Sequence, residues 1–143
     1  MNQKLVVLRG LPASGKSVTS VQYVMKGFKR INGDDLRNSI DNSLYSKDNE
    51  RFIFKIMNIM IKEALRDGYS VVYDNTNFNP YHVTNCRQIA EQFKVDFEVI
   101  DIDTPLQICL ERDLQRTVGR VGKEVIMRMY SKWFKDGKFP AIP

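Results

Sequence analysis

The segment Gly10-Leu-Pro-Ala-Ser-Gly-Lys-Ser17 decides the fold of this chain. It matches the pattern G-x-x-x-x-G-K-[ST], in which glycines let backbone N–H groups turn toward phosphate oxygens at a helix N-terminus. The apolar residues 4–9 before it are typical of a buried strand, and the residues after it, with Val21 and Val24, of a helix. This strand–loop–helix context predicts a site for a nucleoside triphosphate.

Two residues at the end of this loop have chemistry that a purely structural turn would not need. Lys16 supplies a positive charge to the β- and γ-phosphates, and the Ser17 hydroxyl is the expected Mg²⁺ ligand. We therefore expect ATP or another nucleoside triphosphate, together with Mg²⁺. The residues expected to hold the nucleotide are Gly10, Pro12, Ala13, Ser14, Gly15, Lys16 and Ser17.

The length and composition indicate one domain, residues 1–143, of which 43% are hydrophobic. No stretch is apolar enough to cross a membrane or has the form of a signal peptide. The two cysteines are too far apart in the sequence for a C-x-x-C site. We expect a cytoplasmic protein of a bacterial or phage-infected cell, with no membrane partner. The oligomeric state is left open, a homo-oligomer included.

The formal net charge of +5 is concentrated near the C-terminus. Residues 112–138 contain eight basic and three acidic side chains, a balance equal to that of the whole chain. Such a segment is either a solvated helix face or a field that attracts nucleotide phosphates or nucleic acid. The charge alone does not separate these interpretations.

Strand and helix patterns alternate along the chain, which predicts a parallel sheet with helices on both faces. We expect an α/β fold of the P-loop NTPase class, kinase type, with four to five strands and a C-terminal helical lid at about residues 112–123. Strands are expected at residues 4–9, 28–31, 69–73 and 95–102, and helices at about 16–27, 34–40, 47–66, 80–93, 105–115 and 123–135. Ligands of such sheets bind beyond the carboxyl ends of the strands.

The segment Asp34-Asp-Leu-Arg37 follows the second predicted strand. A kinase that acts on a hydroxyl needs a carboxylate to take the proton and a cation to hold the acceptor. Asp34 and Arg37 are three residues apart, so one helical turn places them on the same face. We assign the catalytic role to Asp34 and expect Asp35 only to cap the helix.

The segment Asp74-Asn-Thr-Asn77 follows the third predicted strand. An acid at this point commonly supports Mg²⁺ through water, and the alternatives for Asp74 are an ion pair with Arg37 or a turn. Asn75, Thr76 and Asn77 form turns readily but also offer hydrogen bonds to an acceptor phosphate. The expected acceptor-binding residues are Arg37, Asp74, Asn75 and Thr76.

Arg112, Arg116 and Arg120 recur every four residues, and a helix would align them on one face. They lead into residues 117–122, where two glycines predict a mobile lid. Lid arginines reach the phosphates in the transition state of phosphoryl transfer, so we expect all three to bind the nucleotide and Arg116 to be catalytic. The lone histidine, His82, is assigned no role.

These motifs together resemble the kinase domain of phage polynucleotide kinase/phosphatase. The likeness covers most of the chain: the loop at 10–17, N-x-D-D-x-R at 32–37, T-N-x-N-P at 76–80, the lid from 112 to 125 and M-Y-S-K at 129–132. It implies transfer of the γ-phosphate of ATP to the 5′-hydroxyl of DNA or RNA, as in nucleic acid repair. It also implies Lys16 and Ser17 on the donor, Asp34 as general base, Arg37 on the acceptor phosphate and Arg116 in the lid.

The chain departs from the phage pattern in two places. The aspartate that directly precedes T-N in the phage family is Asn75 here, with Asp74 one residue earlier, which is similar to the D-N-T-N of animal polynucleotide kinases. The segment after Ile40 is shorter, so the acceptor channel is expected to differ. Residues 1–143 leave no room for a phosphatase domain, and we expect no 3′-phosphatase activity from them.

Three other interpretations compete with this one. A small-molecule kinase of the same superfamily, similar to adenylylsulfate or gluconate kinase, would have a compact acceptor pocket. A kinase similar to the seryl-tRNA kinases would act on a charged tRNA. A binding module or regulator that uses ATP without transferring phosphate to nucleic acid would leave Asp34 and Arg37 without a function.

Overall fold

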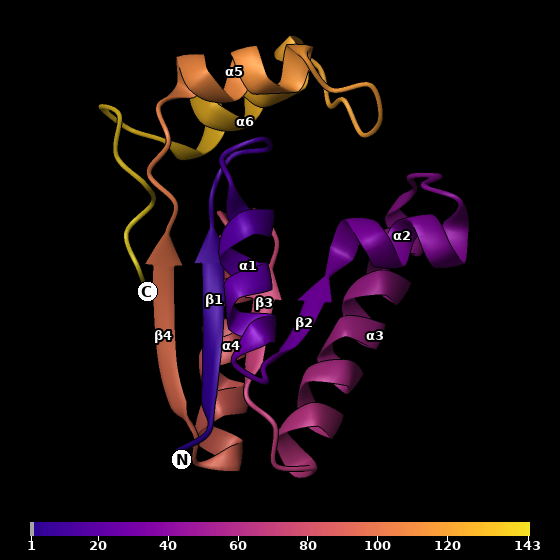
Figure 1. The fold of residues 1–143 in the computed structure, drawn as a ribbon, viewed down its shortest axis with the longest axis vertical. Coiled ribbons are helices and arrows are strands. Elements are labelled where there is room, and N and C mark those ends of the chain that lie inside the picture. Colours follow the sequence, from indigo (N-terminus) through magenta and orange to yellow (C-terminus); the bar gives the residue numbers. More distant parts are fainter. Residues whose placement is uncertain (1) are drawn as a thin grey trace.

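A parallel sheet carries the phosphate loop at the carboxyl end of one of its two inner strands. The computed structural model describes residues 2–143. Four strands pair in the order β2-β3-β1-β4 (Figure 1): β1 (Lys4–Arg9), β2 (Lys29–Asn32), β3 (Val71–Asp74) and β4 (Asp96–Asp101). The register places Leu8 beside Asp74 and Asn32 beside Asp74, so β1, β2 and β3 end at one edge.

Six helices complete the fold of the described residues: α1 (Lys16–Met25), α2 (Gly33–Asp41), α3 (Lys47–Arg66), α4 (Pro80–Phe93), α5 (Leu106–Leu114) and α6 (Lys123–Trp133). Alternate residues of a strand face opposite sides of a sheet. Leu5 and Val7 of β1 pack on one side among residues of α3 and α4, whereas Val6 and Leu8 pack on the other, where Tyr23 of α1 lies. The sheet is therefore covered on both faces, as the alternating pattern predicts.

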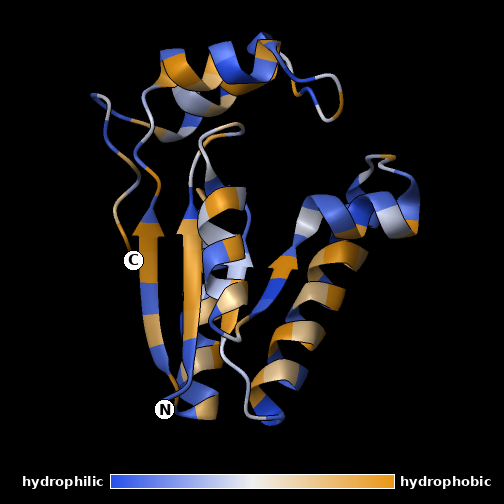
Figure 2. Ribbon diagram, viewed as in Figure 1, coloured by the Kyte–Doolittle hydropathy of each residue, from blue (hydrophilic) through white to orange (hydrophobic). Residues whose placement is uncertain are grey.

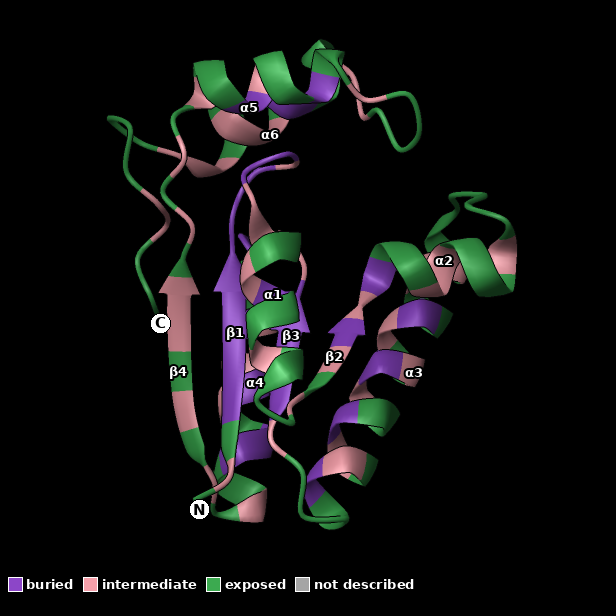
Figure 3. Cartoon of the chain, in the orientation of Figure 1, coloured by how far each residue is buried: buried purple, intermediate pink, exposed green. Residues whose placement is uncertain are grey.

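The core follows the apolar periodicity of the chain. The central strands are apolar in Figure 2 and buried in Figure 3. Helix α3 presents Ile53, Met57, Ile61 and Leu65 to the sheet at a spacing of four residues, and all four are buried. Its bounds agree with the predicted helix because Ser46 caps the N-terminus through the Asn49 backbone N–H.

A second, smaller core lies above the carboxyl edge of the sheet. Helices α5 and α6 pack around Leu11, Phe78, Cys109 and Ile126, and Figure 1 shows this pair above the ends of β1 and β4. The helices on either side of the predicted lid segment, α5 and α6, are thus anchored by apolar contacts of their own. Both cysteines are buried, and burial raises the pKa of Cys86 to about 12.

Several helix ends differ from the predicted ones. The first helix ends at Met25 rather than near residue 27, and the second begins at Gly33 rather than at residue 34. The last helix ends at Trp133 rather than at residue 135, because Phe134 adopts an extended conformation. Within residues 2–143, no helix combines the length and the apolar character needed to cross a membrane.

Candidate active site

The phosphate loop has the backbone that the motif requires. Ala13 and Gly15 have φ values of 64° and 103°, so the chain turns through the left-handed region twice before α1. A Cβ at Gly10 would lie 2.7 Å from Ser14 Oγ, which explains the glycine there. Thr104 Oγ1 donates to the Ser14 carbonyl at 2.6 Å and braces the loop from outside.

Lys16 occupies the loop itself. Its ammonium group donates to the carbonyls of Gly10 and Leu11 at 2.8 Å each. Burial lowers the pKa of Lys16 to about 8, although the charges of Asp74 and Asp34 act in the opposite direction. The lysine therefore lies within the fields of both carboxylates that the sequence singles out.

Asp74 is buried at the end of β3, and its two carboxylate oxygens have different surroundings. Oδ2 accepts from Ser20 Oγ at 3.0 Å and from Arg30 Nε at 2.9 Å, while Asn32 Nδ2 lies 3.3 Å away. Oδ1 is buried without a hydrogen-bond partner. The ion-pair partner of Asp74 is Arg30 of the neighbouring strand, whereas Arg37 pairs with Asp34 and Glu50, so the Arg37 ion pair considered as an alternative role for Asp74 does not form.

The orphaned Oδ1 is relevant to Mg²⁺. Ser20 Oγ joins the Ser17 carbonyl at 3.0 Å to Asp74 Oδ2 at 3.0 Å, so Asp74 lies beside the start of α1. A hydroxyl and an unpaired carboxylate oxygen are ligands that Mg²⁺ accepts, directly or through water. Ser17 and Asp74 thus fit this ion.

Asp34 and Arg37 lie on one face of α2, as their spacing predicts. Arg37 Nη1 contacts Asp34 Oδ1 at 2.9 Å, and the Asp34 side chain is 90% exposed. Arg37 also donates from Nε and Nη2 to the two oxygens of Glu50 at 2.7 and 2.8 Å. Burial alone would lower the pKa of Arg37, but its hydrogen bonds and charge contacts with Glu50 and Asp34 raise it overall. Glu50 on α3 thereby fixes the guanidinium of Arg37 in a position where it also contacts Asp34.

Asp35 does not cap α2, contrary to the prediction. The helix begins at Gly33, earlier than expected, so the capping residue is Asn32, whose Oδ1 accepts from the Asp35 N–H at 2.8 Å. The Asp35 carboxylate instead pairs with Arg30 Nη1 at 2.8 Å. Arg30 therefore links Asp35 to Asp74, while Asp34 remains free to face the cavity.

The amide side chains that follow β3 form hydrogen bonds with the backbone of neighbouring segments. Asn75 Oδ1 accepts from the Gly33 N–H at 2.8 Å and ties the start of α2 to the end of β3. Asn77, with φ of 55°, donates to the Leu8 carbonyl at 2.7 Å. The Thr76 carbonyl accepts from the Gly10 N–H at 3.3 Å. Asn75 and Thr76 also line the cavity, which keeps an acceptor contact available to both.

The three arginines of the predicted lid do not share a helix face, because α5 ends before the second of them. Arg112 Nη1 lies 3.4 Å from the Ser14 carbonyl, at the phosphate loop. Arg116 Nη1 contacts the Gly119 carbonyl at 3.4 Å, within the lid. Arg112 and Arg116 line the cavity, whereas Arg120 turns back to the Leu114 carbonyl and is not among the lining residues. The alignment predicted for Arg120 is therefore wrong.

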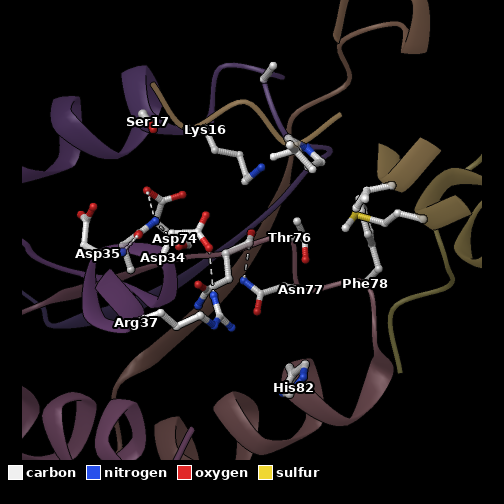
Figure 4. A pocket seen from close by; sticks show the side chains of 18 of the residues that line it. Lys16, Ser17, Asp34, Asp35, Arg37, Asp74, Thr76, Asn77, Phe78 and His82 are labelled. Atoms are coloured by element: carbon white, nitrogen blue, oxygen red, sulfur yellow. Dashed lines mark hydrogen bonds and ion pairs between the residues drawn. The ribbon is translucent and has the colours of Figure 1, made fainter. Parts of the chain in front are cut away.

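Lys16, Ser17, Asp34, Arg37 and Asp74 border one cavity of about 960 Å³ (Figure 4). Residues that line it without a role assigned from the sequence include Arg30, Glu50, Phe54, His82 and Trp133. The sequence carries no local signal for either charged residue: Arg30 lies in the mostly polar strand Lys29–Asn32, and the partner of Glu50 lies on another helix. In Figure 4 His82 lies at the end of the cavity away from Ser17.

A phosphate loop, a carboxylate beside it and a fixed arginine beyond that carboxylate define the class of P-loop kinases. The chain belongs to the AAA domain family AAA_33, whose model matches residues 5–134. Its relatives include kinases.

Two curated relatives and one solved structure illustrate the kinship. The chain is 32% identical to the L-seryl-tRNA(Sec) kinase of Methanococcus maripaludis over 139 residues, which cover 93% of this chain and 53% of that protein. It is 28% identical to the bifunctional polynucleotide phosphatase/kinase of Schizosaccharomyces pombe over 142 residues, 99% of this chain and 31% of that protein. A chain of the Pnkp1/Rnl/Hen1 RNA repair complex superposes with a TM-score of 0.74 at 22% identity, covering 92% of this chain and 43% of that one. The chain thus spans about half or less of the length of these proteins.

Proposed function

We propose that this protein is an ATP-dependent polynucleotide 5′-hydroxyl kinase that acts on DNA or RNA ends. The observation that carries the proposal is the exposed Asp34 carboxylate paired with Arg37, in the cavity that Lys16 also lines. A carboxylate there can take the proton of an acceptor hydroxyl, and a guanidinium beside it can hold the acceptor phosphate. The similarity to a polynucleotide kinase over nearly the whole chain supports this assignment.

The roles of the residues follow from their positions. Asp34 orients the 5′-hydroxyl and accepts its proton, while Arg37, fixed by Glu50, holds the phosphate that follows the terminal nucleoside. Lys16 leaves the loop carbonyls and binds the transferred phosphoryl group, where Arg112 and Arg116 add positive charge. Ser17 and Asp74 would hold Mg²⁺, which neutralises charge on the phosphate oxygens.

The test compares two neighbouring carboxylates. The protein is incubated with γ-labelled ATP, Mg²⁺ and a 5′-hydroxyl oligonucleotide, in parallel with the same oligonucleotide carrying a 5′-phosphate. We expect label only on the 5′-hydroxyl strand, and a loss of about 10²- to 10⁴-fold in kcat for Asp34→Asn. Asp35→Asn is the matched control, because it removes the same charge one residue away and leaves Asp34 in place. ATP binding without transfer to either strand would refute the proposal.

A second candidate is a kinase of the seryl-tRNA type. The observation in its favour is the 32% identity to an L-seryl-tRNA(Sec) kinase over 93% of this chain. A parallel reaction with seryl-tRNA as the acceptor decides between the two. Label that appears on the seryl group and not on 5′-hydroxyl ends would favour this second function.

A further inference from the structure

A basic groove runs between α3 and α4, next to the main cavity. Its volume is about 520 Å³, and Arg51, Lys55 and Lys62 line it from one face of α3. Their spacing of four and seven residues keeps the three cations on the same side of the helix. Arg51 contacts only the exposed Asp48, at 3.5 Å, and none of the described residues that line the groove is acidic.

The groove adjoins the cavity that holds Asp34 and Arg37. Phe54 of α3 and His82 of α4 line both the groove and the main cavity. Their rings stack with centroids 4.4 Å apart and an interplanar angle of 11°, which forms a wall shared by the two spaces. Burial, and then the charge of Arg37, lower the pKa of His82, so this wall is uncharged at neutral pH and lies within the field of Arg37.

The groove also offers an aromatic surface to a ligand. Tyr81 is 66% exposed at its edge, and its ring lies 5.6 Å from that of His82 in an edge-to-face arrangement. Asn85 Nδ2 donates to Asn58 Oδ1 at 2.8 Å, so the two helices are joined and the groove is preformed. Cations that follow a phosphate backbone and an aromatic ring on which a base stacks are the features of single-strand binding.

We propose that this basic groove binds the nucleotides that follow the 5′-terminal one in a single-stranded acceptor. The inference rests on the proposed function and adds the path of the acceptor strand to it. From Arg51 to Lys62 the helix rises by about 16 Å, enough for a few extended nucleotides. Stacking on Tyr81 requires an unpaired base, which selects a single strand over a duplex.

The experiment uses acceptors of two lengths, a dinucleotide and a long single-stranded oligonucleotide, both with 5′-hydroxyl ends. The triple variant Arg51→Gln, Lys55→Gln, Lys62→Gln is expected to raise KM for the long acceptor by about tenfold or more, with kcat unchanged. KM for the dinucleotide is expected to stay within about twofold. The slope of log(1/KM) against log[salt] for the long acceptor should become shallower by about 2, for three lost phosphate contacts.

The matched control removes the same charge elsewhere. Lys132→Gln, Lys135→Gln, Lys138→Gln alters three exposed cations outside the groove and should leave both KM values unchanged. Tyr81→Ala should raise KM for the long acceptor, and Tyr81→Phe should restore it. Equal KM changes in both triple variants, or none in either, would overturn the groove proposal while the proposed function stands. If the unaltered protein labels neither acceptor, the proposed function fails and the groove proposal with it.

Discussion

At the scale of single residues, the ionised groups of the site are held in place by named partners. Arg30 binds Asp74 and Asp35, while Arg37 pairs with both Glu50 and Asp34. Of these carboxylates Asp34 is the most exposed, at 90%. Adjacent carboxylates on α2 thereby acquire different surroundings. The same arrangement keeps one Asp74 oxygen free of protein donors.

Lys16 provides a test of how the phosphate loop binds a triphosphate. Its pKa of about 8 lies well below the usual 10.5 because of burial, so above pH 8 much of the population is neutral. A bound triphosphate adds negative charge and raises the pKa of Lys16, so nucleotide binding near pH 8.5 should take up a fraction of a proton. Calorimetry in buffers of different ionisation enthalpy measures that uptake.

The control for this prediction is Lys16→Arg, whose guanidinium stays charged throughout the same pH range. It should show no linked proton uptake at pH 8.5 if it still binds nucleotide. Uptake of the same size in the variant would assign the proton to another group.

At the scale of elements, the lid segment depends on one buried carboxylate. Asp113 at the end of α5 accepts from the N–H groups of Val121 and Gly122 at 2.8 and 2.9 Å, so it closes residues 114–122 into a loop that leads into α6. Burial alone would raise the pKa of Asp113, but these hydrogen bonds and then Arg116 and Arg120 outweigh it and lower the pKa. The stabilisation is present at neutral pH and is lost as the pH falls through this lowered value, below 3.8.

Asp113→Ala should therefore loosen the lid. The change leaves two backbone N–H groups without partners, and we expect the free energy of unfolding to fall by about 1–3 kcal/mol. Trypsin should also cleave faster at Arg116 and Arg120. Urea denaturation and timed proteolysis measure both effects. Asp113→Asn keeps one acceptor oxygen, so its stability and cleavage rate should lie between those of the unaltered protein and of Asp113→Ala. An unchanged cleavage rate in Asp113→Ala would contradict this account of the lid.

Local patterns predicted the elements well where local chemistry sets their limits. The bounds of α3 and α4 agree with the predicted residues 47–66 and 80–93, because Ser46 and Asn79 cap them through short-range hydrogen bonds. The apolar stripe of α3 was broader than its buried face: Phe52 and Met60 follow the period but are exposed. Periodicity identifies a face, but the neighbouring elements decide how much of it they cover.

Contacts between distant elements could not be predicted in this way. Glu50 reaches Arg37 only because α3 packs beside α2, and nothing in the sequence around Glu50 marks it. The spacing of Arg112, Arg116 and Arg120 suggested one helix, but α5 ends at Leu114. The residues of the phosphate loop were predictable because the motif contains both the backbone turn and the chemistry.

At the scale of the whole molecule, the site joins parts that are far apart in the sequence. The cavity takes residues from the phosphate loop, α2, α3, the end of β3, the lid and α6. A ligand that contacts all of them should stabilise the entire fold, since it binds the folded state and not the unfolded chain.

We expect Mg·ATP at one hundred times its Kd to add about 2.7 kcal/mol to the free energy of unfolding. Thermal denaturation should show a rise in Tm of roughly 2–4 °C for each kcal/mol. Asp34→Asn should show the full rise, because Asp34 is assigned to the acceptor and not to the nucleotide. A rise much smaller in that variant than in the unaltered protein would contradict this division of the cavity.

The burial of both cysteines has a practical consequence for fluorescence work. Cys86 and Cys109 lie inside the fold, and burial raises the pKa of each thiol, so few reactive thiolates form at neutral pH. A cysteine introduced at an exposed lid position such as Val118, which is 87% exposed, would react with a maleimide dye far faster than either native thiol. The natural chain can therefore serve directly as a background for single-site labelling, with no cysteine-free version needed to follow the lid by energy transfer.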